Sequence, residues 1–299
     1  MKKITLILFM MVAVATQAQI LYQITGNGLK QPSYLLGTYH LAPASFADSI
    51  PGFNSAFNKV EQVCGELQMD NLLDSVNMMK MQNAMMLPEG KTIQSLLTAD
   101  EMNRLNALTK ELMGVDFSNA MVAAQLGKFT PAALTTQFSV LMYMKEKPDF
   151  ASAQGIDDYV QRLATEKGKK TIGLESIDDQ MFVIFKSQTL ERQKQLLMCM
   201  VDHKDSEMQL TRDLVSAYQA MDLNKIESLT DMKFNDQCDS TPEEEETLIY
   251  GRNKNWMKSI PSIISEHTTL IAVGAAHLVG EEGLLSLLRQ KGYEVKGVK

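Results

Sequence analysis

Short apolar runs that end at or near glycines predict the strands of this chain. Two such runs, residues 20–24 and 33–36, flank the turn sequence Gly26-Asn27-Gly28 and predict a β-hairpin. Further strand-like runs follow at residues 60–67, 171–175, 270–274 and 293–295. Apolar residues at helical spacing predict helices within residues 45–60, 69–147, 155–168, 176–232, 241–260 and 284–289. This alternation predicts an α/β or α+β fold, with helices flanking a mixed central sheet.

A long helical insert, at about residues 69–150, interrupts this alternation. It is rich in methionine, and the densest group is Met78, Met79, Met81, Met85 and Met86. Methionine is flexible and fills irregular apolar gaps, so the group favours core or groove side chains over a soft-metal site. We expect the sheet and the insert to form one domain over residues 19–299.

Two similar strings stand at opposite ends of the chain. Gly37-Thr38-Tyr39-His40 and Gly274-Ala275-Ala276-His277 each follow an apolar run. A glycine relieves backbone sterics where a strand turns out of a sheet, and the carboxyl edge of an open α/β sheet is where ligands bind. His40 and His277 therefore predict two imidazoles facing one cleft, a pattern that suits zinc, iron or manganese. The alternative is that both rings only hydrogen-bond loops at the sheet edge.

Two glutamates are expected at the same edge. Glu66 and Glu175 stand at the ends of strand-like runs, as the histidines do. Farther along, Arg252 and Asn253 fall on an apolar helix face with Ile249, Trp256 and Ile260. Burial of Arg252 and Asn253 is costly without partners, so they indicate either a functional site or an internal salt bridge.

Charge and size limit the classes of function. The chain has 299 residues, of which 45% are hydrophobic, enough for a substantial core. Its formal net charge is −7, and no basic stripe with interleaved aromatic residues is present. Phosphate contact needs clustered Lys and Arg, so we expect no nucleic-acid partner.

The first residues have the pattern of an export signal. Lys2-Lys3 precedes an apolar run at residues 4–15, and Thr16-Gln17-Ala18 offers small residues for cleavage after Ala18. The run is too short for a comfortable membrane span, and no other stretch could cross a bilayer. We therefore expect residues 1–18 to be a signal peptide and the mature protein to be periplasmic or secreted.

Three cysteines leave at least one thiol outside an intramolecular bridge. Cys64 lies in an apolar strand-like run and is expected to be a buried free thiol. Cys199 and Cys238 flank a helical region, and they either form a disulfide or are both free. No Cys-x-x-Cys pair is present, which excludes a zinc ribbon and a thioredoxin-like motif.

An ordered series of short motifs resembles the TraB/GumN family, also called TIKI-like or PrgY-related. The series comprises residues 36–40, Glu66, Gly155-x-Asp157, Gly168-Lys169, residues 173–175, Gln180, Arg252-Asn253, Trp256 and residues 273–278. The resemblance covers nearly the whole mature chain. It implies a mixed α/β fold similar to erythromycin-esterase-like and ChaN-like proteins, and it implies kinship with metal-dependent proteases.

Together these observations predict an exported metal-dependent hydrolase that acts on a peptide or protein. His40 and His277 would bind a divalent metal such as manganese, cobalt or zinc. Glu66 or Glu175 would complete the metal site, and the other glutamate would be the general base. Arg252 would stabilise the oxyanion and Asn253 would orient it.

Two other functions fit the same sequence. One is a periplasmic protein of this fold that binds a peptide or haem-like ligand without turnover. The other is a metal-independent esterase that uses histidine and glutamate as acid and base.

Overall fold

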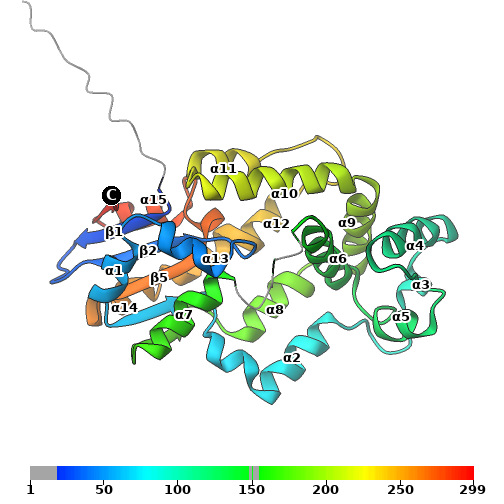
Figure 1. The fold of residues 1–299 in the computed structure, drawn as a ribbon, viewed down its shortest axis with the longest axis horizontal. Helices are drawn as coiled ribbons and strands as arrows, with labels where there is room; N and C mark the ends of the chain where they lie inside the picture. The colour runs from blue at the N-terminus through cyan, green and yellow to red at the C-terminus, as the bar shows by residue number, and fades with distance from the viewer. Residues whose placement is uncertain (1–18, 148–149, 151–154) are drawn as a thin grey trace, which may run out of the picture.

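The computed structural model describes residues 19–147, residue 150 and residues 155–299 (Figure 1). The predicted signal peptide, residues 1–18, lies outside the described residues, so its assignment stays a prediction. None of the helices in the described part is long and apolar enough to cross a membrane.

A six-stranded mixed sheet forms one half of the molecule, in the order β4-β3-β5-β2-β1-β6. The strands are β1 (Leu21–Gly26), β2 (Ser33–Thr38), β3 (Gln62–Gly65), β4 (Lys170–Gly173), β5 (Thr269–Gly274) and β6 (Tyr293–Gly297). Strands β4, β3, β5 and β2 are mutually parallel, whereas β1 is antiparallel to both of its neighbours. The predicted α/β class with a mixed sheet is confirmed.

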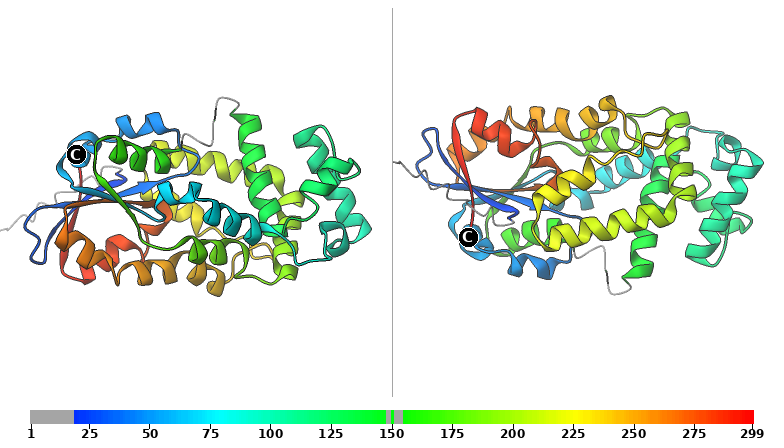
Figure 2. Two further views of the ribbon diagram at one scale, coloured as in Figure 1. Left: turned by 90° about the horizontal axis from the view of Figure 1, so that it is seen from below. Right: turned by 90° about the horizontal axis from the view of Figure 1, so that it is seen from above.

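Burial explains why these runs form strands. All residues of β2 and β3, and all but the last residue of β5, are buried, as expected for parallel strands that helices cover on both faces. The edge strand β6 alternates buried and exposed positions at first, which fits one covered and one solvated face. Helices α1 (Phe53–Lys59) and α7 (Ile156–Glu166) lie on one face, and α14 (Ile260–Glu266) and α15 (Leu284–Gln290) lie on the other (Figure 2).

The helix expected at residues 45–60 is divided in two. A 3₁₀ helix, η1 (Ala44–Ser49), is followed by α1, and Gly52 stands between them with a φ of +75°. This left-handed conformation favours glycine and ends the first helix before Pro51-Gly52. Thr98 and Thr241 each begin a helix, since each side chain caps its helix and forms a capping box with a glutamate three residues on.

The other half of the molecule is helical (Figure 1). The insert forms η2 (Met69–Leu73), α2 (Ser75–Met85), α3 (Ile93–Leu96), α4 (Ala99–Met113), α5 (Ala120–Gln125) and α6 (Pro131–Glu146). A second set follows β4 and comprises α8 (Ile177–Phe185), α9 (Leu190–Asp202), α10 (Lys204–Gln219) and α11 (Leu223–Thr230). The two sets share one apolar core, in which Leu105, Leu134, Phe138 and Leu197 are fully buried. The insert therefore packs against a later part of the chain rather than on itself alone.

The methionine cluster divides between core and surface. Met81 and Met85 pack against the small core between α2 and α8, whereas Met78 and Met79 are exposed.

The chain returns to the sheet through α12 (Pro242–Glu245), a π-helix η4 (Glu246–Tyr250), α13 (Gly251–Trp256) and α14. A final 3₁₀ helix, η5 (Ala275–His277), follows β5.

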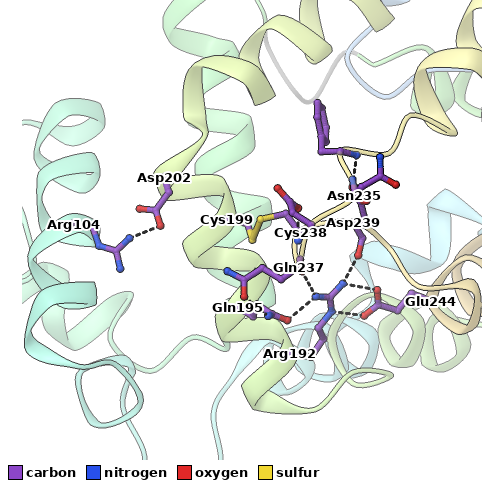
Figure 3. Close-up of a disulfide and its surroundings, with 12 residues drawn as sticks. Arg104, Arg192, Gln195, Cys199, Asp202, Asn235, Gln237, Cys238, Asp239 and Glu244 are labelled. Carbon is purple, nitrogen blue, oxygen red and sulfur yellow. Dashed lines mark hydrogen bonds and ion pairs between the residues drawn. A yellow bond between two sulfur atoms is a disulfide. The ribbon is translucent and has the colours of Figure 1, made fainter.

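A disulfide joins Cys199 on α9 to Cys238 in the segment before α12, with a Cα–Cα distance of 5.7 Å (Figure 3). Cys64 is a buried free thiol, as predicted. Beside the disulfide, Arg192 reinforces the same connection. Its guanidinium donates to the Glu244 carboxylate at 2.8 and 2.9 Å and to the carbonyl oxygens of Gln237 and Asp239, each at 2.6 Å.

Loss of the disulfide should destabilise the fold. The bridge spans a sequence separation of 39 residues, for which loop-closure entropy in the unfolded chain predicts a loss of about 3–4 kcal/mol. We expect a Cys199→Ser/Cys238→Ser double variant to unfold at lower urea concentration than the wild type. A reductant should lower the stability of the wild type to that of the variant and leave the variant unchanged. Equal responses of both proteins to the reductant would contradict this prediction.

Candidate functional site

Four neighbouring parallel strands lead to the four predicted donor residues. His40 follows β2, Glu66 follows β3, Glu175 follows β4 and His277 follows β5. Because parallel strands have their carboxyl ends on the same side, all four residues leave the sheet at one edge. The sequence predicted that these residues lie at the carboxyl edge because each follows a strand-like run. The strand order places all four at that edge.

The glycines of the two Gly-x-x-His strings act through close approach. A Cβ on Gly37 would lie 3.2 Å from Ala275 Cα, and one on Gly274 would lie 3.4 Å from Glu66 Oε1. Neither glycine has a positive φ. The steric relief predicted where each strand leaves the sheet is therefore not that of a left-handed backbone; at Gly37 the missing side chain makes room for Ala275 of η5.

Arg252 occupies the centre of this edge, and every one of its five N–H groups has an acceptor. Nε and Nη2 donate to Glu175 at 3.1 and 2.7 Å, and Nη2 also donates to Glu66 Oε2 at 2.5 Å. Nη1 donates to the Leu248 carbonyl oxygen at 3.1 Å and to His277 Nε2 at 3.0 Å. The predicted inward position of Arg252 is confirmed, and its partners form an internal salt-bridge network.

The two glutamates differ in how fully their lone pairs are used. Glu175 accepts four hydrogen bonds, from Arg252 Nε and Nη2, Gln180 Nε2 and Trp256 Nε1. Glu66 accepts three, from Arg252, Gln180 and the Gly274 backbone N–H. An ionised carboxylate has about four acceptor positions, so Glu66 keeps one unused. Its Oε1 lies 3.8 Å from His277 Nε2.

Charge keeps Glu66 ionised in spite of its burial. Burial alone raises the pKa of Glu66, but the Arg252 guanidinium and the Gly274 N–H act in the opposite direction. The net result is a pKa below the usual range for glutamate.

His277 is buried and held in one tautomer. Asn253 donates its two amide hydrogens to the backbone carbonyls of His277, at 3.2 Å, and Glu282, at 2.9 Å. Asn253 Oδ1 therefore accepts, and it lies 2.8 Å from His277 Nδ1. The ring hydrogen is thus on Nδ1, and the lone pair of Nε2 faces Glu66 and Arg252. Burial, together with Arg252, lowers the pKa of His277 to about 4, which keeps the ring neutral.

His40 lies at the open side of the edge, where 76% of its side chain is exposed. Its Nδ1 lies 2.9 Å from Asp157 Oδ2, and Thr38 donates to the other oxygen of that carboxylate. The hydrogen bond to Asp157 raises the pKa of His40 to about 9, and the charges of Glu66 and Arg252 also act on the ring. The Nε2 atom of His40 is the ring nitrogen that Asp157 leaves free.

Three further residues complete the site; the sequence indicated Asp157 and Gln180 only through the family motifs, and Trp256 also through helical periodicity. Asp157 holds His40, and Gln180 bridges the two glutamates at 3.3 and 3.0 Å. The Trp256 ring stacks at 4.5 Å from the His277 ring and at 4.8 Å from the Arg252 guanidinium. Periodicity marked Trp256 as an inward residue, but no local pattern gave its partners.

Within the described residues, the one group of three metal-donor side chains with donor atoms within 4.8 Å of one another is His203, Asp236 and Cys238. The donors at the carboxyl edge are thus not gathered this closely, and this other group is itself a poor metal site. The Cys238 sulfur is bonded to Cys199, so it is no thiolate and cannot act as a metal ligand in this state. The remaining two side chains, those of His203 and Asp236, are exposed.

Comparison with known proteins identifies the family. The sequence profile of the TraB/PrgY/gumN family matches residues 20–297. The chain belongs to this family. No solved structure matches it, so the expected likeness to erythromycin-esterase-like and ChaN-like proteins stays a prediction.

The relatives of this TraB/PrgY/gumN protein include animal proteins. It is 26% identical to Metalloprotease TIKI2 of Danio rerio, a match that covers 89% of this chain and 58% of the relative. It is also 26% identical to Metalloprotease TIKI homolog of Amphimedon queenslandica, covering 94% and 62%, and 23% identical to Metalloprotease TIKI1 of Homo sapiens, covering 89% and 59%. The chain thus spans about six-tenths of the length of these relatives.

Removal of the Arg252 charge should destabilise this family member strongly. In an Arg252→Met variant, Glu66 and Glu175 would remain buried without a cationic partner, a loss of about 3–5 kcal/mol. Arg162→Met is the control, because the ion pair of Arg162 with Glu166 is exposed and should contribute less than about 1 kcal/mol. Urea unfolding of both variants measures the difference.

The same comparison tests the cause. Adding Glu66→Gln and Glu175→Gln to Arg252→Met should recover part of the lost free energy of unfolding, because the two unpaired charges disappear. Similar losses for Arg252→Met and Arg162→Met would show that the buried network is not a stabilising element.

Proposed function

We propose that this protein is a metal-dependent hydrolase of peptide bonds. The observation that carries the proposal is the arrangement of the two histidines at the carboxyl edge. Asp157 engages Nδ1 of His40 and Asn253 engages Nδ1 of His277, so Nε2 is the nitrogen of each ring that could bind a metal, which in His277 would replace the hydrogen bond from Arg252. Metal-binding histidines in proteins have this same outer hydrogen bond. The relatives named as metalloproteases support the same reading.

The proposed metal ligands are His40, His277 and Glu66. The 3.8 Å between Glu66 Oε1 and His277 Nε2 suits two atoms that bind one ion at about 2.0–2.2 Å each. Glu66 is preferred to Glu175 because it keeps an unused acceptor position on that side. His40, which is exposed, would have to turn its Nε2 toward Glu66 to complete the set.

A divalent manganese, cobalt or zinc ion would lower the pKa of water and polarise the scissile carbonyl. In this proposal the remaining carboxylate, Glu175, is the general base. It takes a proton from the water that adds to the carbonyl carbon and passes it to the leaving nitrogen as the C–N bond breaks. The Arg252 N–H groups stabilise the negative charge that develops on the carbonyl oxygen.

Arg252 can serve the substrate only after a rearrangement. All five of its N–H groups have acceptors, and four of the resulting hydrogen bonds go to Glu66, Glu175 and His277. A metal held by Glu66 and His277 would compete with two of these contacts. One N–H each of Arg252 Nη1 and Nη2 would then become available for the substrate, and Glu175 would have to lose one of its own hydrogen bonds to accept the proton.

One observation favours a second function, a protein of this fold that binds a ligand without turnover. Arg252 forms ion pairs with both Glu66 and Glu175, so both buried carboxylates have a cationic partner without a metal, and one of the two negative charges is offset. A peptide or haem-like ligand could then bind without chemistry at this edge. Metal content decides between the two functions.

We further propose that the protein is exported to the periplasm or secreted, with cleavage after Ala18. The disulfide between Cys199 and Cys238 supports an oxidising compartment. The basic and apolar segments of residues 1–18 support an export signal.

Metal content should depend on both site histidines. We expect about one equivalent of divalent metal in the mature protein, measured by mass spectrometry after purification without a metal-binding tag. His40→Ala and His277→Ala should each lower that content severalfold or more, because each removes an imidazole ligand. His267→Ala is the matched control, since His267 is exposed and contacts only Glu61 at this position. An equal content in all four proteins would overturn the metal site, and hydrolysis that survives chelation would favour the metal-independent esterase.

The two glutamates should separate binding from chemistry. We expect Glu66→Gln to lower metal content, because the amide is a weaker ligand than a carboxylate. Glu175→Gln should keep the metal and lower peptide hydrolysis about 100-fold or more, as loss of a general base does. Equal metal content in both variants, or loss in Glu175→Gln alone, would contradict this assignment.

A further inference from the structure

A cavity of about 680 Å³ lies beside the carboxyl edge, between α6, α8, α9, α11 and η4. None of the five proposed catalytic or ligand residues, His40, Glu66, Glu175, Arg252 and His277, lines it. Its wall nevertheless includes Ala276, which precedes His277 in η5, and Leu248, whose carbonyl oxygen holds Arg252. We call this cavity the side cleft. It lies in the size range of pockets that bind small molecules and side chains.

Several apolar side chains of the side cleft are exposed to solvent. Ile184 on α8 is 38% exposed and Leu248 on η4 is 47% exposed. Val183, Leu196 and Val279 continue the apolar lining. Exposed apolar surface that gathers in a concave site marks a binding surface more often than isolated exposed residues do.

The charges of the side cleft are almost all negative. Its one basic residue is Arg192, which Glu244 and the neighbouring carbonyls saturate (Figure 3). Glu245 pairs with Lys233, a residue outside the lining.

Three further carboxylates of the lining, those of Glu227, Asp231 and Glu243, have no ion-pair partner among the residues that the structure describes. The pKa of Tyr250 is raised in part by this negative charge. Burial raises the pKa of Tyr250, and Asp231 and Glu227 are among the acidic residues that raise it further. The acidic end of the cleft therefore lies beside the turn that leads to Arg252.

We propose that the side cleft binds the part of a peptide next to the scissile bond and selects an apolar side chain paired with a lysine or arginine. The apolar side chain would pack on Ile184 and Leu248. The basic side chain would meet Glu227, Asp231 and Glu243, whose charges have no other described partner. The net charge of the chain, −7, acts in the same direction, because it attracts basic and repels acidic peptides. This inference rests on the peptidase function proposed above and adds its substrate class.

Peptide binding to the full mature chain tests the proposal without turnover. The probes are fluorescently labelled peptides that differ only at a central pair, which is Leu-Lys, Leu-Glu or Ser-Lys, measured by anisotropy in the presence of EDTA. We expect the Leu-Lys peptide to bind about tenfold or more tightly than either of the others, and we expect added salt to reduce its advantage over Leu-Glu.

Two sets of variants separate the apolar and the acidic parts of the cleft. Ile184→Gln/Leu248→Gln should weaken Leu-Lys binding about tenfold, whereas Met121→Gln, an exposed apolar residue on α5, should not. Glu227→Gln/Asp231→Asn/Glu243→Gln should abolish the preference for Leu-Lys over Leu-Glu. Glu89→Gln is its control, because Glu89 is exposed and lies outside the lining.

The outcomes distinguish this inference from the proposed hydrolase. Equal or absent binding of the three peptides, or equal effects of test and control variants, would overturn the side cleft as a substrate site. If such a protein still bound metal and cleaved peptides, the hydrolase would stand without this cleft. Selective peptide binding by a protein without metal would support the cleft and favour the binding function instead.

Discussion

A guanidinium buried between two carboxylates is the interaction on which the carboxyl edge of the sheet depends. Moving charged groups out of water costs several kcal/mol each, and close pairing with complete hydrogen bonding is needed to offset that penalty. Arg252 meets this need through Glu66, Glu175, His277 and the Leu248 carbonyl oxygen. The ends of β3 and β4, the π-helix η4 and the helix α13 must keep their relative positions, because a shift of any one would leave a buried charge without its partner.

The parallel sheet makes this arrangement possible. Hydrogen bonds along β4-β3-β5-β2 fix the spacing of the strand ends, so side chains one to three residues beyond them meet without long loops. Helices α7 and α13 then supply the outer partners of the histidines. Asp157 and Asn253 have the same effect on the two rings, since each engages Nδ1 and directs Nε2 away from itself. The sheet thus sets the positions of the donors, and the helices set their orientation.

Much of this site could be predicted, because apolar runs that end near glycine mark strand ends in the sequence itself. The inward position of Arg252 and Asn253 could be predicted equally well, since periodicity shows which side of a helix is buried. The hydrogen-bond partners of the site residues could not be predicted. Gln180 contacts Glu66 across a sequence separation of 114 residues, and that contact exists because β3 lies beside β4 in the sheet order. The neighbours of the two glycines could not be predicted for the same reason: a sequence shows the residue without a side chain but not the residue, Ala275 or Glu66, that lies beside it.

The charge balance at this edge also connects folding to function. With Arg252 in place, Glu66 and Glu175 are both hydrogen-bonded without a metal. In the proposed hydrolase, Arg252 has to give up some of these contacts, and one of its other contacts is the carbonyl oxygen of Leu248, a residue that also lines the side cleft. A peptide packed on the Leu248 side chain would contact the π-helix η4, whose Leu248 carbonyl oxygen accepts from Arg252. A π-helix is a form of helix that is frequent at functional sites. In the proposed hydrolase, peptide binding and the loss of Arg252 hydrogen bonds would therefore both involve the short segment η4. Peptide binding could then favour the conformation in which Arg252 is available to the substrate.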